Sequence, residues 1–247
     1  MSLAHTARSR LGRLPRSVRF GLLTVVYAAL VVATWTALTV LTLPSVGYLA
    51  QQGPTTTAFM QRYLEENDGE LPRCEWVAYD DISPHLKRAV LVSEDINFFS
   101  HDGFDTGEMS QALRDAWMEL EAPRGASTIT QQLARNLFLT SARTPWRKFT
   151  EAMLTRRLES SLSKRRILEI YLNVVEFGPG LYGAEAASRH YFGVAAAVLD
   201  ERQAAELAVV LPRPKVWGPG HSSSGYQSAV ERVLRRMKKA EFLWKRI

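Results

Sequence analysis

Cysteine is almost absent from this 247-residue chain, since Cys74 is its single thiol. One cysteine excludes an intramolecular disulfide framework and a cysteine-rich zinc site. Histidine is also scarce, and none of the histidines has the spacing typical of metal ligands. They are His5, His85, His101, His190 and His221. We therefore expect no dedicated metal site.

Acidic residues are missing from residues 1–44, which carry five arginines. These are Arg8, Arg10, Arg13, Arg16 and Arg19. The whole chain has 31 basic and 25 acidic residues, so without these arginines the two signs nearly balance, at 26 against 25. The net charge of +6 is therefore a membrane-topology signal and does not indicate a nucleic-acid partner.

Charge is absent from residues 20–43, an apolar run of 24 residues. As a helix it would be about 36 Å long, enough to cross about 30 Å of hydrocarbon. A cleaved signal peptide would have a shorter apolar core and a small-residue cleavage site, so we predict a transmembrane anchor. The arginines precede the span, which predicts residues 1–19 in the cytoplasm and everything after Pro44 outside it.

Alternating apolar and polar residues, the strand pattern, are rare in the remainder, which predicts a mainly α fold. Residues 44–81 are polar and rich in turn residues, so we expect a neck with one short helix near 58–66 and little chemistry. Residues 82–247 form the expected single domain. Its predicted helices are 83–95, 108–120, 125–140, 146–161, 164–177, 184–191, 199–211 and 229–246.

The helix expected within residues 125–140, GASTITQQLARNLFLT, has an unusual polar face. Exposed faces are normally rich in Glu and Lys, whereas amide and hydroxyl side chains suggest directional hydrogen bonds. Thr128 followed by Gln131 fits a capping box, which specifies the helix start. The polar arc comprises Thr128, Gln131, Gln132, Arg135 and Asn136. The alternative is a helix cap followed by an incidental amide-rich face.

Two acidic positions are candidates for catalysis. Glu94, beside Asp95, follows an apolar run, and a desolvated carboxylate with a raised pKa suits a general base. Glu151 shares a helix face with Arg147 and Lys148, in a region where nine basic residues between 135 and 166 outnumber two acids. Such an excess suits a pyrophosphate. An acid at a helix end and an exposed salt-bridged helix explain the same residues.

Two motif matches are misleading. Residues 178–183, GPGLYG, match GxGxxG, but the dinucleotide-binding fingerprint requires a preceding strand and a helix precedes them here. Residues 161–164, SLSK, match the SxxK of penicillin-binding transpeptidases, but no KTG follows. We expect neither activity.

Taken in order, the remaining motifs resemble the peptidoglycan glycosyltransferase family. E-D-x-x-F-x-x-H-x-G is matched from Glu94 to Gly103, and G-x-S-T-[IL]-T-Q-Q-L-x-K-N is matched from Gly125 to Asn136, with Arg135 where lysine is usual. R-K-x-x-E is matched at residues 147–151, and residues 164–193 and 207–214 are similar to the last two blocks. The resemblance covers residues 82–214 and extends to the glycosyltransferase domain of class A penicillin-binding proteins. Because a penicillin-binding domain would not fit in the remaining residues, we expect a monofunctional biosynthetic member.

The family implies a mainly α, lysozyme-like domain that polymerises lipid II into linear β-1,4 glycan strands of peptidoglycan. By resemblance, Glu94 deprotonates the acceptor 4-hydroxyl, which attacks the undecaprenyl-diphosphate-linked donor chain with inversion. Arg135, Arg147 and Lys148 would stabilise the pyrophosphate, and Glu151 would position it or assist its departure. The other residues expected to bind substrate are Phe98, His101, Ser127, Thr128, Gln132 and Asn136.

The sequence requires no cofactor, and a divalent cation, Mg²⁺ or Mn²⁺, is the one candidate, beside Glu151. The resemblance implies lipid II, the growing glycan chain and the cell inner membrane as partners, with proteins of cell-wall synthesis and division as a further class. Two alternatives stay open. A lysozyme-type lytic enzyme would use two carboxylates to cut glycan, and a catalytically silent scaffold would explain the anchor but not both glutamate motifs.

Overall fold

The structure is a computed structural model that describes residues 15–119, 127–140, 142 and 144–247. Its two compact units are Met1–Pro44 and Ser45–Ile247. Gly125, the first residue of the second matched motif, lies outside the described residues, as do Arg8, Arg10 and Arg13.

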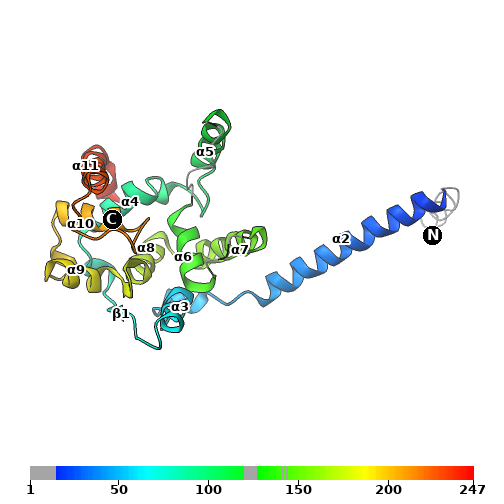
Figure 1. Cartoon of the computed structure of the whole chain (residues 1–247), viewed down its shortest axis with the longest axis horizontal. Helices are drawn as coiled ribbons and strands as arrows, with labels where there is room; N and C mark the ends of the chain where they lie inside the picture. Colours follow the sequence, from blue (N-terminus) through cyan, green and yellow to red (C-terminus); the bar gives the residue numbers. More distant parts are fainter. Residues whose placement is uncertain (1–14, 120–126, 141, 143) are drawn as a thin grey trace. The chain divides into compact units, whose positions relative to one another are not determined.

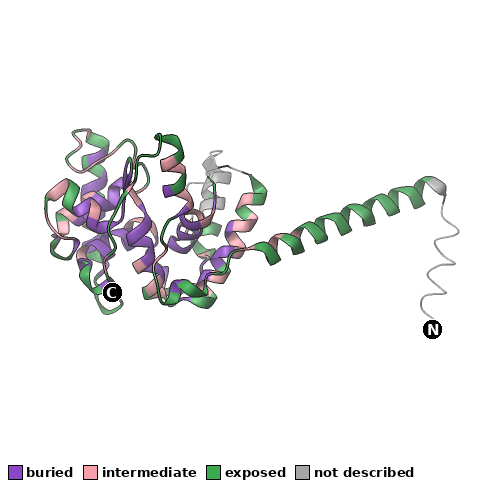
Figure 2. Ribbon diagram, turned by 90° about the horizontal axis from the view of Figure 1, so that it is seen from below, coloured by how far each residue is buried: buried purple, intermediate pink, exposed green. Residues whose placement is uncertain are grey.

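The described part of the first unit, from Pro15 to Pro44, is mainly one long helix, α2 (Arg16–Thr42). Among the described residues, the segment Ser17–Ala50, which includes all of α2 except Arg16, is the one long and apolar enough to cross a membrane. Most residues of α2 are exposed (Figure 2), and they include large apolar ones such as Leu23 and Val25. The hydroxyls of Thr24 and Thr39 donate to carbonyl oxygens four residues earlier, at 3.0 and 2.9 Å, so their polarity is satisfied within the helix. This helix matches the predicted anchor.

The second unit is mainly helical, as expected. Figure 1 shows α4, α9, α10 and α11 gathered on one side and α3, α6 and α7 on the other, with α8 between them. The larger helices are α4 (Pro84–Glu94), α5 (Thr106–Glu119), α6 (Ile129–Phe138), α7 (Pro145–Ser161), α8 (Lys164–Val174), α9 (Ala184–Phe192), α10 (Glu201–Val210) and α11 (Ser224–Lys239). Short 3₁₀ turns occupy Gly47–Ala50, Tyr79–Asp81, Phe98–Ser100, Ala196–Val198 and Glu241–Lys245. Buried aliphatic side chains fill the space between the helices.

The predicted neck is part of this unit, so the expected domain boundary at residue 82 is not a boundary between compact units. Leu49 and Tyr79 are buried, and α3 (Ala58–Glu66), the expected short helix, packs against α6. The sequence prediction missed this because the polar surface of the segment conceals the few apolar residues that anchor it. The compact unit therefore begins at Ser45.

A small sheet ends the helix that was predicted over residues 164–177. The chain leaves α8 at Val174 and forms β2 (Glu176–Gly178), which pairs antiparallel with β3 (Leu181–Tyr182), while β1 (Arg73–Cys74) pairs parallel with β3. The GPGLYG segment is thus a β-hairpin and not a dinucleotide-binding turn. Gly183, at φ +85°, could not carry a side chain, because a Cβ would lie 2.6 Å from the carbonyl oxygen of Asn173.

The carboxyl-terminal helix begins earlier than predicted. The hydroxyl of Ser223 caps α11 by accepting from the backbone N–H of Tyr226 at 3.3 Å, and the helix ends at Lys239 instead of continuing to 246. This shift matters for the site, because α11 brings Arg236 to a pocket next to Glu94.

Candidate active site

The start of α6 is fixed by the predicted capping box. The backbone N–H of Gln131 donates to the Thr128 hydroxyl, and the backbone N–H of Thr128 donates to Gln131 Oε1 at 3.0 Å. The Thr128 hydroxyl also donates to the carbonyl oxygen of Gly103 at 2.7 Å. Both side chains are buried, so the polar groups at this end of the helix face bond within the protein and not to solvent.

Glu94 is the last residue of α4, and its partly buried side chain faces the polar arc of α6. Gln132 Nε2 donates to Glu94 Oε2 at 2.8 Å. Burial raises the pKa of Glu94, while the hydrogen bonds from Gln132 and Ser93 oppose that rise. A partly desolvated carboxylate with a raised pKa is suited to accept a proton near neutral pH.

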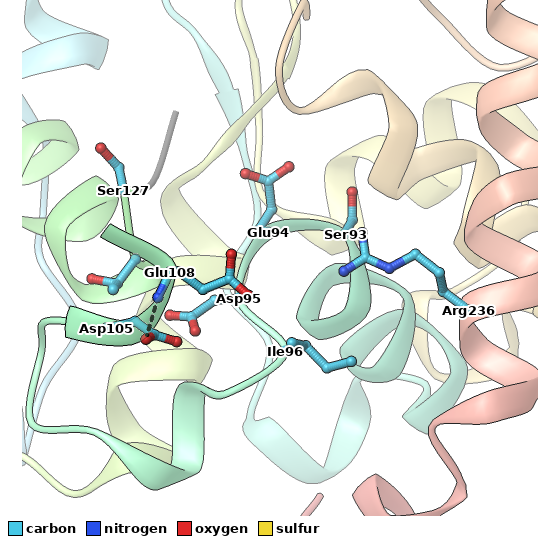
Figure 3. Close-up of a pocket in the computed structure, with 9 residues that line it drawn as sticks. Ser93, Glu94, Asp95, Ile96, Asp105, Glu108, Ser127 and Arg236 are labelled. Atoms are coloured by element: carbon cyan, nitrogen blue, oxygen red, sulfur yellow. Dashed lines mark hydrogen bonds between the residues drawn. The ribbon is translucent and has the colours of Figure 1, made fainter. Parts of the chain in front are cut away.

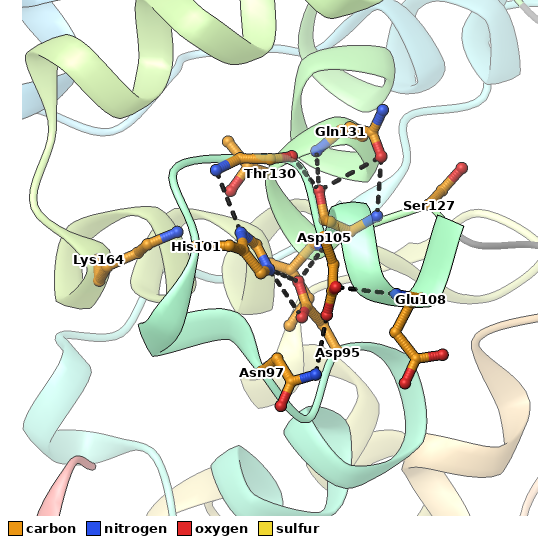
Figure 4. A network of polar contacts seen from close by, with 12 residues as sticks. Asp95, Asn97, His101, Asp105, Glu108, Ser127, Thr130, Gln131 and Lys164 are labelled. Atoms are coloured by element: carbon orange, nitrogen blue, oxygen red, sulfur yellow. Dashed lines mark hydrogen bonds and ion pairs between the residues drawn. The ribbon is translucent and has the colours of Figure 1, made fainter. Parts of the chain in front are cut away.

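Asp95, the residue after Glu94, belongs to a network of polar contacts at the start of α6 (Figure 4). Its buried carboxylate accepts from the backbone N–H of Ile129 at 2.9 Å and faces His101 Nε2 at 3.0 Å. His101 Nδ1 accepts from the backbone N–H of Gly103 at 3.1 Å, so the proton of a neutral ring lies on Nε2 and is donated to Asp95. These bonds hold the end of α4 against α6 and thereby fix where Glu94 points.

A cleft of about 790 Å³ lies on one side of Glu94. Three cations share its wall, Arg135 from α6 and Arg147 and Lys148 from α7. Asn136, also on α6, lines the same cleft. The full lining is Phe59, Ser93, Glu94, Ser127, Gln132, Arg135, Asn136, Arg147, Lys148, Val175, Glu176, Leu211, Pro212 and Pro214.

Glu151 lies behind two of these cations and is itself fully buried. Its Oε2 accepts from Arg147 Nη1 at 2.6 Å, and its Oε1 accepts from Lys148 Nζ. The expected shared face of α7 is therefore real, but the carboxylate does not line the cleft. Its observed contacts position the two cations that do.

A second, smaller pocket of about 200 Å³ lies beside Glu94 (Figure 3). Four acids line it, Glu94, Asp95, Asp105 and Glu108, and Arg236 extends into it from α11. The cleft and this pocket have Ser93, Glu94 and Ser127 in common. Glu94 is thus the acid at the junction of the two spaces.

The structure brings most of the predicted site residues together. Those that line the cleft are Glu94, Ser127, Gln132, Arg135, Asn136, Arg147 and Lys148, and Thr128 lines the smaller pocket. Phe98 and His101 line neither space. The ring of Phe98 is fully buried with Lys164 Nζ 4.5 Å from its centroid, and His101 is used by Asp95. Phe98 and His101 would therefore affect substrate binding only indirectly, by holding their neighbours in position.

The sequence reasoning did not identify Phe59, Ser93, Glu176, Arg236 or the proline-rich segment 211–214 as site residues. Phe59 belongs to the segment that was interpreted as a neck, and Arg236 lies on an exposed basic helix whose pattern is typical of a solvated face. Ser93 adjoins a matched motif and segment 211–214 overlaps one. Their positions in the sequence could therefore have indicated that they belong to the site.

Glu151 does not fit the divalent cation considered beside it. Both of its oxygens accept from cationic groups, and its side chain is closed to the cleft. A hard divalent cation needs several open oxygen ligands. Among the described residues, no group of three or more His, Cys, Asp or Glu side chains could hold a metal ion. The observed partners of Glu151 are therefore the two cations, and its carboxylate is not arranged as a metal ligand.

Comparison with known proteins identifies the class of protein that carries this fold and cleft. Residues 61–238 match the transglycosylase family, which is more than half of the chain. The chain therefore belongs to the transglycosylase family and is an enzyme that transfers glycosyl groups in peptidoglycan synthesis.

Individual relatives agree with this placement. The chain is 44% identical over 191 residues to the biosynthetic peptidoglycan transglycosylase of Nitrosospira multiformis, covering 76% of this chain and 83% of the relative. It is 46% identical to that of Laribacter hongkongensis, covering 77% and 85%. It is 51% identical over 166 residues to that of Aromatoleum aromaticum, covering 66% and 72%.

Proposed function

We propose that this protein polymerises lipid II into linear β-1,4 glycan strands of peptidoglycan and so contributes to cell-wall biogenesis and cell shape. The observation that supports this most is the joint lining of one cleft by Glu94 and by Arg135, Arg147 and Lys148. A carboxylate with a raised pKa can take a proton, and a group of cations can hold a pyrophosphate. Glycosyl transfer from a lipid-pyrophosphate donor needs both.

In the proposed reaction, the 4-hydroxyl oxygen of lipid II attacks the anomeric carbon of the lipid-linked donor chain. The new glycosidic bond forms as the bond between that carbon and the pyrophosphate oxygen breaks, and the configuration inverts. Glu94 takes the hydroxyl proton, and the leaving pyrophosphate keeps the electron pair. Arg135, Arg147 and Lys148 stabilise the charge that develops on it, which is most effective when the charges are already in place.

The remaining polar groups of the cleft would orient the sugar-phosphate. Ser127 and Asn136 line the cleft and are available for this role, whereas Gln132 acts through Glu94. Arg135 stands where the resembled motif usually has lysine. A planar guanidinium can bind two phosphate oxygens at once, so the contact at this position would be bidentate.

The direct test incubates detergent-solubilised protein with labelled lipid II. We expect a polymer that lysozyme digests. Release of short products from finished sacculi, with no polymer from lipid II, would instead support the lytic alternative. Absence of both products from a folded protein would support the scaffold alternative.

We further propose that the protein is a single-pass inner-membrane protein with a cytoplasmic amino terminus and a periplasmic catalytic unit. Lipid-linked substrate is held in the same membrane as the helix α2, so the anchor would keep the enzyme where its donor and acceptor arrive. Lipid II and the growing chain are the proposed ligands, with proteins of cell-wall synthesis or division as further partners.

This topology predicts the behaviour of a reporter fused after Ile247 that is active only outside the cytoplasm. The fusion should be active, because Arg16 and Arg19 precede the apolar run and the next basic residue is Arg62. Activity is measured in intact cells, with expression checked by immunoblot. An inactive fusion expressed at a normal level would reverse the assignment.

A further inference from the structure

Tyr171 connects the middle of α8 to Glu94 through one intervening side chain. Its ring and hydroxyl are fully buried, and the hydroxyl donates to Gln132 Oε1 at 2.8 Å. Gln132 Nε2 in turn donates to Glu94 Oε2, also at 2.8 Å. Among the described residues, Gln132 is the one hydrogen-bond partner of the Tyr171 hydroxyl.

A glutamine amide can present either its oxygen or its nitrogen to a neighbour, since the two differ by a half-turn of its terminal group. In the observed orientation, the amide nitrogen of Gln132 donates to Glu94 and its amide oxygen accepts from Tyr171. In the reversed orientation the amide oxygen would face the Glu94 carboxylate, and the Tyr171 O–H would lose its acceptor. Both faults are costly in a buried site.

The hydroxyl of Tyr171 is a dependable donor. Burial raises the pKa of Tyr171 well above its ordinary value, and the nearby Glu94 carboxylate raises it further, so the phenol keeps its proton throughout the neutral range. The aromatic ring of Tyr171 is buried in the core on which α8 packs. It therefore cannot move away from Gln132 without opening that core.

We propose that Tyr171 is a positioning residue that fixes the Gln132 amide with its nitrogen toward Glu94, and thereby sets the pH range in which Glu94 works as the base. This rests on the proposed role of Glu94 in lipid II polymerisation. Without the Tyr171 hydroxyl, the amide is free to reverse, and the ionised form of Glu94 loses its hydrogen-bond donor.

Other charged groups also line the cleft or the smaller pocket beside Glu94, and none of them is substituted in the Tyr171→Phe protein. They are Asp95 at the end of α4, Asp105 and Glu108 at the start of α5, Arg135 from α6, Arg147 and Lys148 from α7, Glu176 from β2 and Arg236 from α11. The effect of removing the hydroxyl is therefore attributable to the amide.

The test is Tyr171→Phe, assayed for lipid II polymerisation across pH. A lost donor to the carboxylate raises the pKa of Glu94, so the base is protonated up to a higher pH. The acidic limb of kcat/KM should move to higher pH by about one unit, and the rate on that limb should fall about tenfold. Binding of an unreactive lipid II analogue should change less than twofold, because Tyr171 does not line the cleft.

Tyr226→Phe is the matched control. Tyr226 is also fully buried, but its hydroxyl faces the backbone oxygen of Glu206 at 3.5 Å and does not approach Glu94. It should lose stability without moving the acidic limb. When the rate at each pH is expressed per folded molecule, a Tyr171→Phe protein that folds poorly still gives a readable profile.

A double-mutant cycle separates the relay from general damage to the core. In a Gln132→Ala background, Tyr171→Phe should produce no further shift of the limb, because the connection is already broken. An unshifted limb in Tyr171→Phe, or a full additional shift in the double variant, would overturn the proposal. Failure of the wild-type protein to polymerise lipid II would instead refute the proposed function.

Discussion

Glu94→Gln is expected to lower lipid II polymerisation by at least about 10²- to 10⁴-fold, the usual contribution of a general base. Glutamine keeps the shape of the side chain and can still meet Gln132, but it cannot accept the proton of the acceptor hydroxyl. In the wild type, activity should rise as pH increases through the raised pKa of Glu94. The measurement is initial polymerisation rate against pH for both proteins.

The same substitution should leave stability unchanged or improve it at neutral pH. A carboxyl whose pKa is raised in the folded state stabilises the fold fully at low pH, and that stabilisation is lost as pH rises through the folded-state pKa. Glutamine carries no charge to desolvate, so its melting temperature near pH 7 should equal or exceed that of the wild type. Such a gain is typical of active-site residues kept for function at the expense of stability.

Glu185→Gln is the control for this prediction. Glu185 is a buried acid on α9 that accepts from the backbone N–H of Ala196 at 2.7 Å and pairs with Arg189. Its substitution should lower the melting temperature and leave the rate per folded molecule unchanged. A Glu94→Gln protein that binds the unreactive lipid II analogue and polymerises at nearly the wild-type rate would exclude Glu94 as the base.

Local patterns predicted the parts of this site that depend on neighbours along the chain. The capping box at Thr128 and Gln131 is a four-residue pattern, and it fixes the start of α6 as expected. The shared face of Arg147, Lys148 and Glu151 follows from helical spacing alone. The apolar run of α2 was equally clear, because length and absence of charge are read directly from the sequence.

Burial could not be predicted in the same way, because it depends on which segments pack together. Glu151 reads equally well as an exposed acid, yet it is closed off behind its own two cations. Residues 45–81 read as a neck, but Phe59 reaches the cleft. Tyr171 has the pattern of an ordinary core aromatic, and only the folded arrangement of α6 and α8 connects its hydroxyl to Gln132.

Glu151→Gln is expected to lower polymerisation by about 10²- to 10³-fold, the usual effect of disrupting one preorganised charge contact in a transition state. Glu151 holds Arg147 at 2.6 Å and also binds Lys148, whose side chain is otherwise half exposed. Without the negative charge, both cations are free to leave the positions in which they face the cleft. Arg147→Ala and Lys148→Ala should each reproduce part of this loss while the fold is retained.

Glu159→Gln separates this effect from a loss of stability. Glu159 lies two turns later on α7, where its largely buried carboxylate pairs with Lys164 at 2.7 Å and accepts from the Thr130 hydroxyl at 2.6 Å. Both substitutions break a buried or largely buried ion pair, so both should lower the melting temperature. Only Glu151→Gln should lower the rate per folded molecule, since Glu159 does not touch a cation of the cleft. Equal rates per folded molecule in the two variants would mean that Glu151 only stabilises α7. Arg135, Arg147 and Lys148 would then bind the pyrophosphate without any positioning by Glu151.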